Sequence, residues 1–127
     1  MPRKRSATLT EAEQRLMEVL WDTDGATVAQ VLASLPKRGR PAFNTVQTLM
    51  RILEQKGFLR HETSGRAFVY YPTVKRVDAS RAAVKNLLHR FFNNSAELLT
   101  VRLLEDEQLG AEELERLKRL TDEAKRR

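Results

Sequence analysis

Between residues 44 and 51 the chain carries Asn44, Thr45, Gln47, Thr48 and Arg51. Asn and Gln can each form two hydrogen bonds to an adenine edge, Arg can do the same with guanine, and Thr offers a hydroxyl and a methyl group. Their spacing places all five on one face of a helix. Lys and Glu, which usually fill exposed helix positions, are absent from this face. The pattern therefore favours a surface that reads bases in DNA over a merely polar, solvent-exposed face.

Three arginines flank this segment. Arg40 lies in a cationic loop at residues 36–41, whereas Arg60 and Arg66 belong to a region with an alternating apolar pattern. We expect these guanidinium groups to contact phosphates or a neighbouring minor groove. An ordinary exposed charge is the alternative interpretation of Arg66. A basic run at residues 3–5 can act as a minor-groove arm, although a frayed terminus is the favoured interpretation.

Enzymatic and metal chemistry find no support in the sequence. The chain has no cysteine, which excludes disulfides, thiolate zinc sites and Cys nucleophiles. His61 and His89 lie in different segments without ligand spacing, so we expect no metal and no other cofactor. A Gly-rich phosphate loop and a nucleophile beside its base are also missing. The aromatic residues at 68–71 can stack on single strands, but such side chains more often pack on their own helices.

The elements that position these side chains begin with two capping boxes. Thr10 with Glu13, and Thr27 with Gln30, are each typical of a helix start. A third helix is expected to begin near residues 42–44. Its inward-facing residues at helical spacing are Val46, Leu49, Met50 and Leu53.

A change of period after the third helix predicts a β-hairpin. Apolar and polar residues alternate over 58–62 and 67–72, and a turn lies between them at 63–66. Gly65 would adopt a positive φ in that turn. Three helices followed by a hairpin predict a mainly α fold with a small β-hairpin wing, the winged helix-turn-helix, over residues 1–76.

Residues 77–127 form a predicted helical segment. Asp78 or Ser80 is expected to cap its first helix, residues 93–95 interrupt it, and Ser95 and Gly110 precede the next two. About fifty residues rarely bury enough apolar surface to fold alone. We therefore expect a homodimer, formed through Leu87, Phe91, Leu98, Val101, Leu104, Leu114 and Leu117.

The net charge of +6 is confined to the first part of the chain. Residues 1–76 contain 13 Lys and Arg against 7 Asp and Glu, whereas residues 77–127 contain 10 of each. A basic domain joined to a neutral segment is typical of nucleic-acid binders. No stretch approaches the roughly 18 consecutive apolar residues of a membrane span, so we expect a cytoplasmic protein without a membrane partner.

The chain resembles the BlaI/MecI/CopY family of winged-helix transcriptional repressors. The resemblance extends from Leu9 over nearly the whole chain and rests on the order and spacing of several segments: Leu9–Glu13, Met17–Trp21, Thr45–Leu49, Lys56–Gly57, Gly65–Tyr70, Leu104–Glu107 and Glu112–Leu117. It implies a homodimeric repressor on a palindromic, double-stranded operator. It also places Asn44 to Arg51 in the recognition helix and Arg66 in the wing.

Two departures from the family pattern leave the inducing signal open. Copper-responsive members end in paired Cys-x-Cys ligands, which this chain lacks. Antibiotic-responsive members are cleaved at an Asn-Phe bond, and the similar position here is Arg102-Leu103. An upstream sensor or protease is therefore unidentified. The alternative function is a winged-helix protein-interaction module without base-specific DNA binding.

Overall fold

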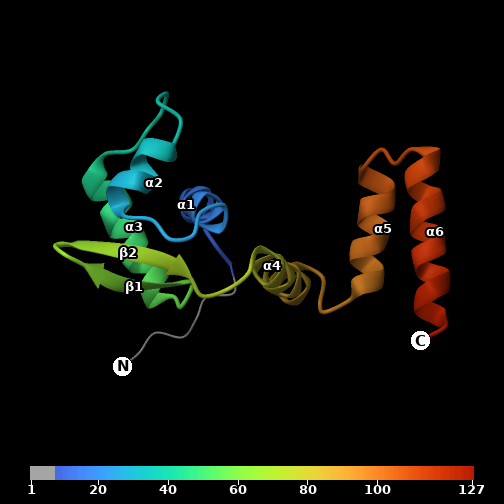
Figure 1. Ribbon diagram of the computed structural model, residues 1–127. Coiled ribbons are helices and arrows are strands. Elements are labelled where there is room, and N and C mark those ends of the chain that lie inside the picture. Colours follow the sequence, from blue (N-terminus) through green and yellow to red (C-terminus); the bar gives the residue numbers. More distant parts are fainter. Residues whose placement is uncertain (1–7) are drawn as a thin grey trace. The chain divides into compact units, whose positions relative to one another are not determined.

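The two predicted capping boxes start the first two helices of the computed structural model, which describes residues 8–127 (Figure 1). In α1 (Glu11–Trp21), the Glu13 amide donates to the Thr10 hydroxyl at 3.2 Å, and the Glu13 carboxylate accepts from the Thr10 amide at 2.8 Å. Thr27 and Gln30 repeat this exchange at the start of α2 (Val28–Ser34). Both predicted helix starts are confirmed.

The third helix and the hairpin also agree with the sequence prediction. Helix α3 (Phe43–Gln55) is followed by strands β1 (Leu59–Ser64) and β2 (Ala67–Pro72), which pair antiparallel with Leu59 opposite Pro72. Gly65 in the tight turn has φ +62°, a conformation that costs glycine little. This order of elements is a winged helix, which confirms the predicted fold class.

One backbone pairing was not predicted. Ala26, between α1 and α2, exchanges two backbone hydrogen bonds with Tyr70 of β2, at 3.0 and 2.8 Å. The preceding Gly25 has φ +93°, and a Cβ built there would overlap the Tyr71 ring. Glycine therefore meets both a backbone requirement and a close approach, and the connection between α1 and α2 is tied to the hairpin.

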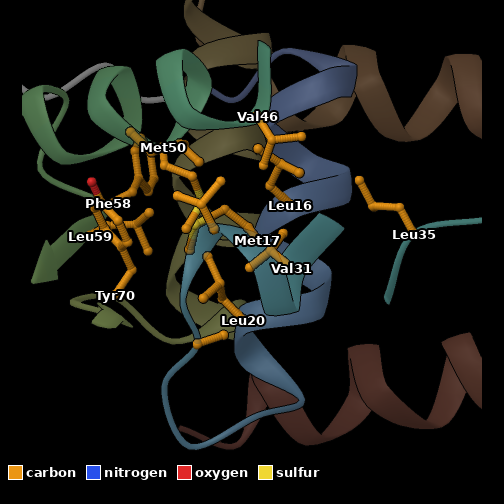
Figure 2. Packing of buried hydrophobic residues seen from close by; sticks show 13 residues of the cluster. Leu16, Met17, Leu20, Val31, Leu35, Val46, Met50, Phe58, Leu59 and Tyr70 are labelled. Carbon is orange, nitrogen blue, oxygen red and sulfur yellow. The ribbon is translucent and has the colours of Figure 1, made fainter. Parts of the chain in front are cut away.

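The core lies between α1, α2, α3 and the hairpin (Figure 2). Met17, Leu20 and Val31 of the first two helices meet Val46 and Met50 of α3, and all five are fully buried. The hairpin closes this cluster with the buried side chains Leu59 and Tyr70. Because α3 buries one side in the core, its opposite side faces outward.

One charged side chain is buried among the described residues. Glu13 is 2% exposed, and its carboxylate accepts a hydrogen bond from Lys56, with Nζ to Oε1 at 2.7 Å. Burial alone would raise the pKa of Glu13, but the bonds from Lys56 and Thr10 and the Lys56 charge hold this pKa below its ordinary value. The pair links the start of α1 to the end of α3.

Three further helices follow the hairpin: α4 (Arg76–Phe91), α5 (Ala96–Asp106) and α6 (Ala111–Lys125). The expectation that Asp78 or Ser80 caps α4 was wrong, since the helix begins two residues before Asp78, and the Ser80 hydroxyl donates to the Val77 carbonyl at 2.8 Å. Ser95 caps α5 as predicted, accepting from the Leu98 amide at 3.0 Å.

The first turn of α4 is fixed to α1. Arg76 pairs with Glu18 at 2.6 Å and Asp22 at 3.3 Å, and its guanidinium lies 5.3 Å from the Trp21 ring centre. The Trp21 indole donates to the Val74 carbonyl at 2.9 Å. These long-range contacts hold the first turn of α4 against α1.

The described residues divide into two compact units, and the boundary along the chain lies within α4, between Asn86 and Leu87. The sequence pattern predicts a division before residue 77, in the first turn of α4. No side chain of α4, α5 or α6 is buried. Among the described residues, no helix combines the length and apolar character needed to cross a membrane.

Candidate nucleic-acid interface

The five predicted base-reading side chains of α3 all reach the surface. Asn44, Thr45, Thr48 and Arg51 are exposed and Gln47 is half-buried. Within residues 8–127, no hydrogen bond or ion pair occupies the side chains of Asn44, Gln47 or Arg51. The Thr48 hydroxyl donates to the Asn44 carbonyl at 2.9 Å and can still accept. The face thus presents donors and acceptors that the fold does not use.

A cleft of about 510 Å³ lies between α3 and the hairpin. Its walls, which we call the wing-side cleft, include Phe43, Gln47 and Arg51 of α3 together with Arg66 and Phe68 of the hairpin. Two residues predicted on α3 and one predicted in the turn are therefore brought to one place. The cleft combines a guanidinium from each element with the Gln47 amide.

A second cleft, of about 380 Å³, lies on another side of α3. This loop-side cleft is lined by Arg15 of α1, by Arg38 and Arg40 of the connection between α2 and α3, and by Thr45. Arg40 donates to the Leu35 carbonyl at 2.5 Å and to the Ala33 carbonyl at 3.3 Å. Its guanidinium thereby fixes the loop to the end of α2.

Arg60 is separated from the other predicted residues. It pairs with Glu62 at 2.8 Å, and its guanidinium lies 4.5 Å from the centre of the Tyr71 ring. Arg60 lines neither cleft. These partners compete with a phosphate for the guanidinium, so the predicted DNA contact of Arg60 has less structural support than that of Arg66.

A polar contact connects the hairpin to α3, and aromatic stacking orders the hairpin side chains. His61 Nδ1 lies 2.6 Å from the Glu54 carboxylate, and the His61 ring stacks on Phe68 with centroids 4.1 Å apart. Burial raises the pKa of Tyr70; the charge of Glu54 adds to this effect and that of Arg51 opposes it. These contacts fix the position of the turn relative to the exposed face of α3.

Residues of the clefts that were not predicted from the sequence include Arg15 and Phe43. Arg15 follows Glu11 by one helical turn, a spacing typical of a surface ion pair, and the two side chains are 4.0 Å apart. Phe43 gave no signal beyond its place at a helix start. Residues 3–5, the suggested minor-groove arm, lie outside the described residues. Among the residues described, no group of three or more His, Asp or Glu side chains is arranged to hold a metal.

Comparison with known proteins identifies the family. The family model of penicillinase repressors matches residues 9–123. The chain belongs to the BlaI/MecI family of penicillinase repressors. This membership confirms the resemblance found in the sequence.

Individual relatives match over most of their length. The penicillinase repressor of Bacillus licheniformis is 31% identical over 124 residues, which are 98% of this chain and 97% of the relative. The methicillin resistance regulatory protein MecI of Mammaliicoccus sciuri is 23% identical over 88% of this chain and 91% of its own. The solved DNA-binding domain of the repressor BlaI is 32% identical, with a TM-score of 0.53, and covers 60% of this chain and 93% of its own.

Proposed function

We propose that this chain is a transcriptional repressor, and not an enzyme, that binds a palindromic DNA operator as a homodimer and reads it with the exposed face of α3. The observation that carries the proposal is the exposed polar face of α3 beside two arginine-lined clefts. On this face the side chains of Asn44, Gln47 and Arg51 have no hydrogen-bond or ion-pair partner among residues 8–127. The similar proteins also support the proposal, because they include a penicillinase repressor and the DNA-binding domain of the repressor BlaI. Operator DNA lies in the bacterial cytoplasm, where we expect the protein to act.

The two clefts suit the borders of a major groove. A major groove about 12 Å wide admits a helix, and phosphate backbones border it on both sides. Arg66 in the wing-side cleft and Arg38 in the loop-side cleft would each face phosphates, while Gln47 and Arg51 face base edges. Phosphate contacts set the register of a protein on DNA, and base contacts set its sequence preference.

The tail supports the homodimer. Its large apolar side chains remain well exposed, with Phe91 at 67%, Leu104 at 50% and Leu117 at 45%. A second copy can cover them with the same face of its own tail, as two-fold symmetry requires. Such a dimer carries two copies of α3, so the operator would be an inverted repeat with half-sites about 34 Å, or a multiple of it, apart.

The proposal is tested by selecting DNA from a random pool with the intact chain and measuring its affinity at several salt concentrations. We expect the selected site to bind at least about 10³-fold more tightly than a scrambled one, and the affinity to fall linearly with salt on logarithmic axes. Arg66→Ala should weaken binding to both DNAs. It should also reduce the slope of log affinity against log salt concentration by about one unit. Arg119→Ala in α6 makes the same charge change and should leave the slope unaltered.

A different outcome would identify the alternative function. A winged-helix module that recognises another protein would enrich no sequence from the pool. Its residual affinity for DNA would also depend weakly on salt, because few counterions are released. That combination would contradict the proposed repressor.

A further inference from the structure

Phe43 is a partly exposed aromatic side chain outside the buried core. It is the first residue of α3 and is 44% exposed. It belongs neither to the buried core nor to the partly buried apolar side chains that pack on it. Phe68, the other phenylalanine of the wing-side cleft, is instead stacked on His61. Among residues 8–127, no ring contact engages Phe43.

The position of Phe43 on α3 aligns it with the proposed base-reading residues. Phe43, Gln47 and Arg51 follow one another at intervals of four residues, so they form one stripe along the helix. All three line the wing-side cleft. In helix-turn-helix proteins, residues near the start of the recognition helix contact base edges. Any DNA base that meets Gln47 therefore has a neighbour within reach of Phe43.

The chemistry of the phenyl ring restricts what it can recognise there. A phenyl ring offers no hydrogen-bonding group, so it cannot distinguish the polar edges of guanine, cytosine or adenine. The apolar feature of the major groove is the C5-methyl group of thymine, and phenylalanine is among the side chains that contact it. The positive charges of Arg51 and Arg66 in the same cleft make a nucleic acid the fitting occupant of this surface.

We propose that Phe43 is a specificity-determining residue, which contacts the C5-methyl group of a thymine in each operator half-site. The inference rests on the proposed function, because it assigns one base contact within that DNA complex. The inference adds an apolar base contact to the polar base contacts proposed for Gln47 and Arg51. The operator should therefore contain a thymine next to the position read by Gln47.

Deoxyuridine differs from thymidine by that methyl group alone, and this supplies the test. Each thymine of the selected operator is replaced in turn by deoxyuridine, and the affinity of the intact chain is compared with that of Phe43→Ala. At one thymine of each half-site, the intact chain should lose about fourfold in affinity, as expected for one buried methyl group. Phe43→Ala should bind the two DNAs equally at that position. Phe43→Leu, which keeps an apolar side chain, should retain part of the discrimination.

The controls separate this inference from the proposed function. Circular dichroism and sedimentation of Phe43→Ala should match those of the intact chain, and a monomeric variant would place Phe43 in the dimer contact and overturn the inference. Sequence-specific binding in which no thymine distinguishes the two proteins would overturn the inference and leave the repressor function standing. If Phe43→Ala loses the same affinity for selected and for scrambled DNA, Phe43 contacts the DNA backbone, and this result would also overturn the inference. If the intact chain selects no sequence, both proposals fail.

Discussion

The helices before the hairpin and those after it all carry apolar residues, but they differ in what covers these residues. Leu20 of α1 and Leu53 of α3 are fully buried, whereas Leu104 of α5 and Leu117 of α6 remain about half exposed. In the first unit, three helices and a hairpin supply apolar faces to one another. The difference shows that the helical spacing of apolar residues identifies an apolar face. Whether that face is buried depends on the elements that pack against it.

Removing the second unit should have the largest effect on binding. A chain that ends at Asn86 keeps every residue of the buried core and should remain folded, but it should sediment as a monomer. Its affinity for the selected inverted repeat should fall by roughly 10² to 10⁴, because the second head no longer binds intramolecularly. Sedimentation and operator titration measure the two effects. A truncated chain that still forms dimers would assign dimerisation to the first unit.

A pair of leucine substitutions sharpens the comparison between the units. Leu20→Ala should lower the free energy of unfolding by about 2 to 5 kcal/mol at any protein concentration, because it leaves a cavity in the core. Leu117→Ala should lower Tm by an amount that depends on concentration, because its cover comes from a second chain. Arg119→Ala, on the opposite side of α6, is the matched control. A Tm of the intact chain that does not vary with concentration would contradict the proposed dimer.

The buried charge pair gives the first unit a pH dependence. Glu13→Gln should lower the free energy of unfolding by about 3 kcal/mol at neutral pH, because Lys56 loses its charged partner. The folded-state pKa of Glu13 lies below the ordinary value of 4.5, so the carboxylate stabilises the fold above that value and this stabilisation disappears as the pH falls below it. Unfolding titrations of the variant should lack this acid-sensitive component. Glu11→Gln, on an exposed position of α1, should retain it.

A smaller effect is expected where the connection between α1 and α2 meets the hairpin. Gly25→Ala should cost about 1 to 2 kcal/mol, because φ is positive and the Tyr71 ring occupies the space of the new methyl group. Gly39 also has a positive φ but has nothing within 4 Å of a built Cβ. Gly39→Ala should therefore cost less than Gly25→Ala in thermal unfolding. Equal costs would show that the Tyr71 ring moves aside freely.

Local signals explain which elements could be predicted from the sequence. The capping boxes at Thr10 and Thr27 act within one helical turn, and the change of period after α3 spans only the hairpin. The polar face of α3 follows from helical spacing alone. These features depend on residues that are neighbours in the chain, so the winged helix and the exposed row on α3 were accessible without the structure.

Contacts between distant residues explain what the sequence did not reveal. The first turn of α4 contacts α1 through pairing of Arg76 with Glu18, 58 residues away. The bridge from Ala26 to Tyr70 involves a single residue and leaves no alternating pattern. Arg60 meets Tyr71 through the cross-strand register. The grouping of Arg66 with Gln47 depends on how the hairpin packs against α3.

The measurement that tests base reading by α3 most directly compares Gln47→Ala and Arg51→Ala with the intact chain on the selected operator, on its single-pair variants and on random DNA. Gln14→Ala, an exposed glutamine on α1, is the matched control. Each α3 variant should lose about 1 to 3 kcal/mol of binding free energy on the operator and should lose its preference at one base-pair position. Its affinity for random DNA should equal that of the intact chain. Equal losses on the operator and on random DNA would contradict the account.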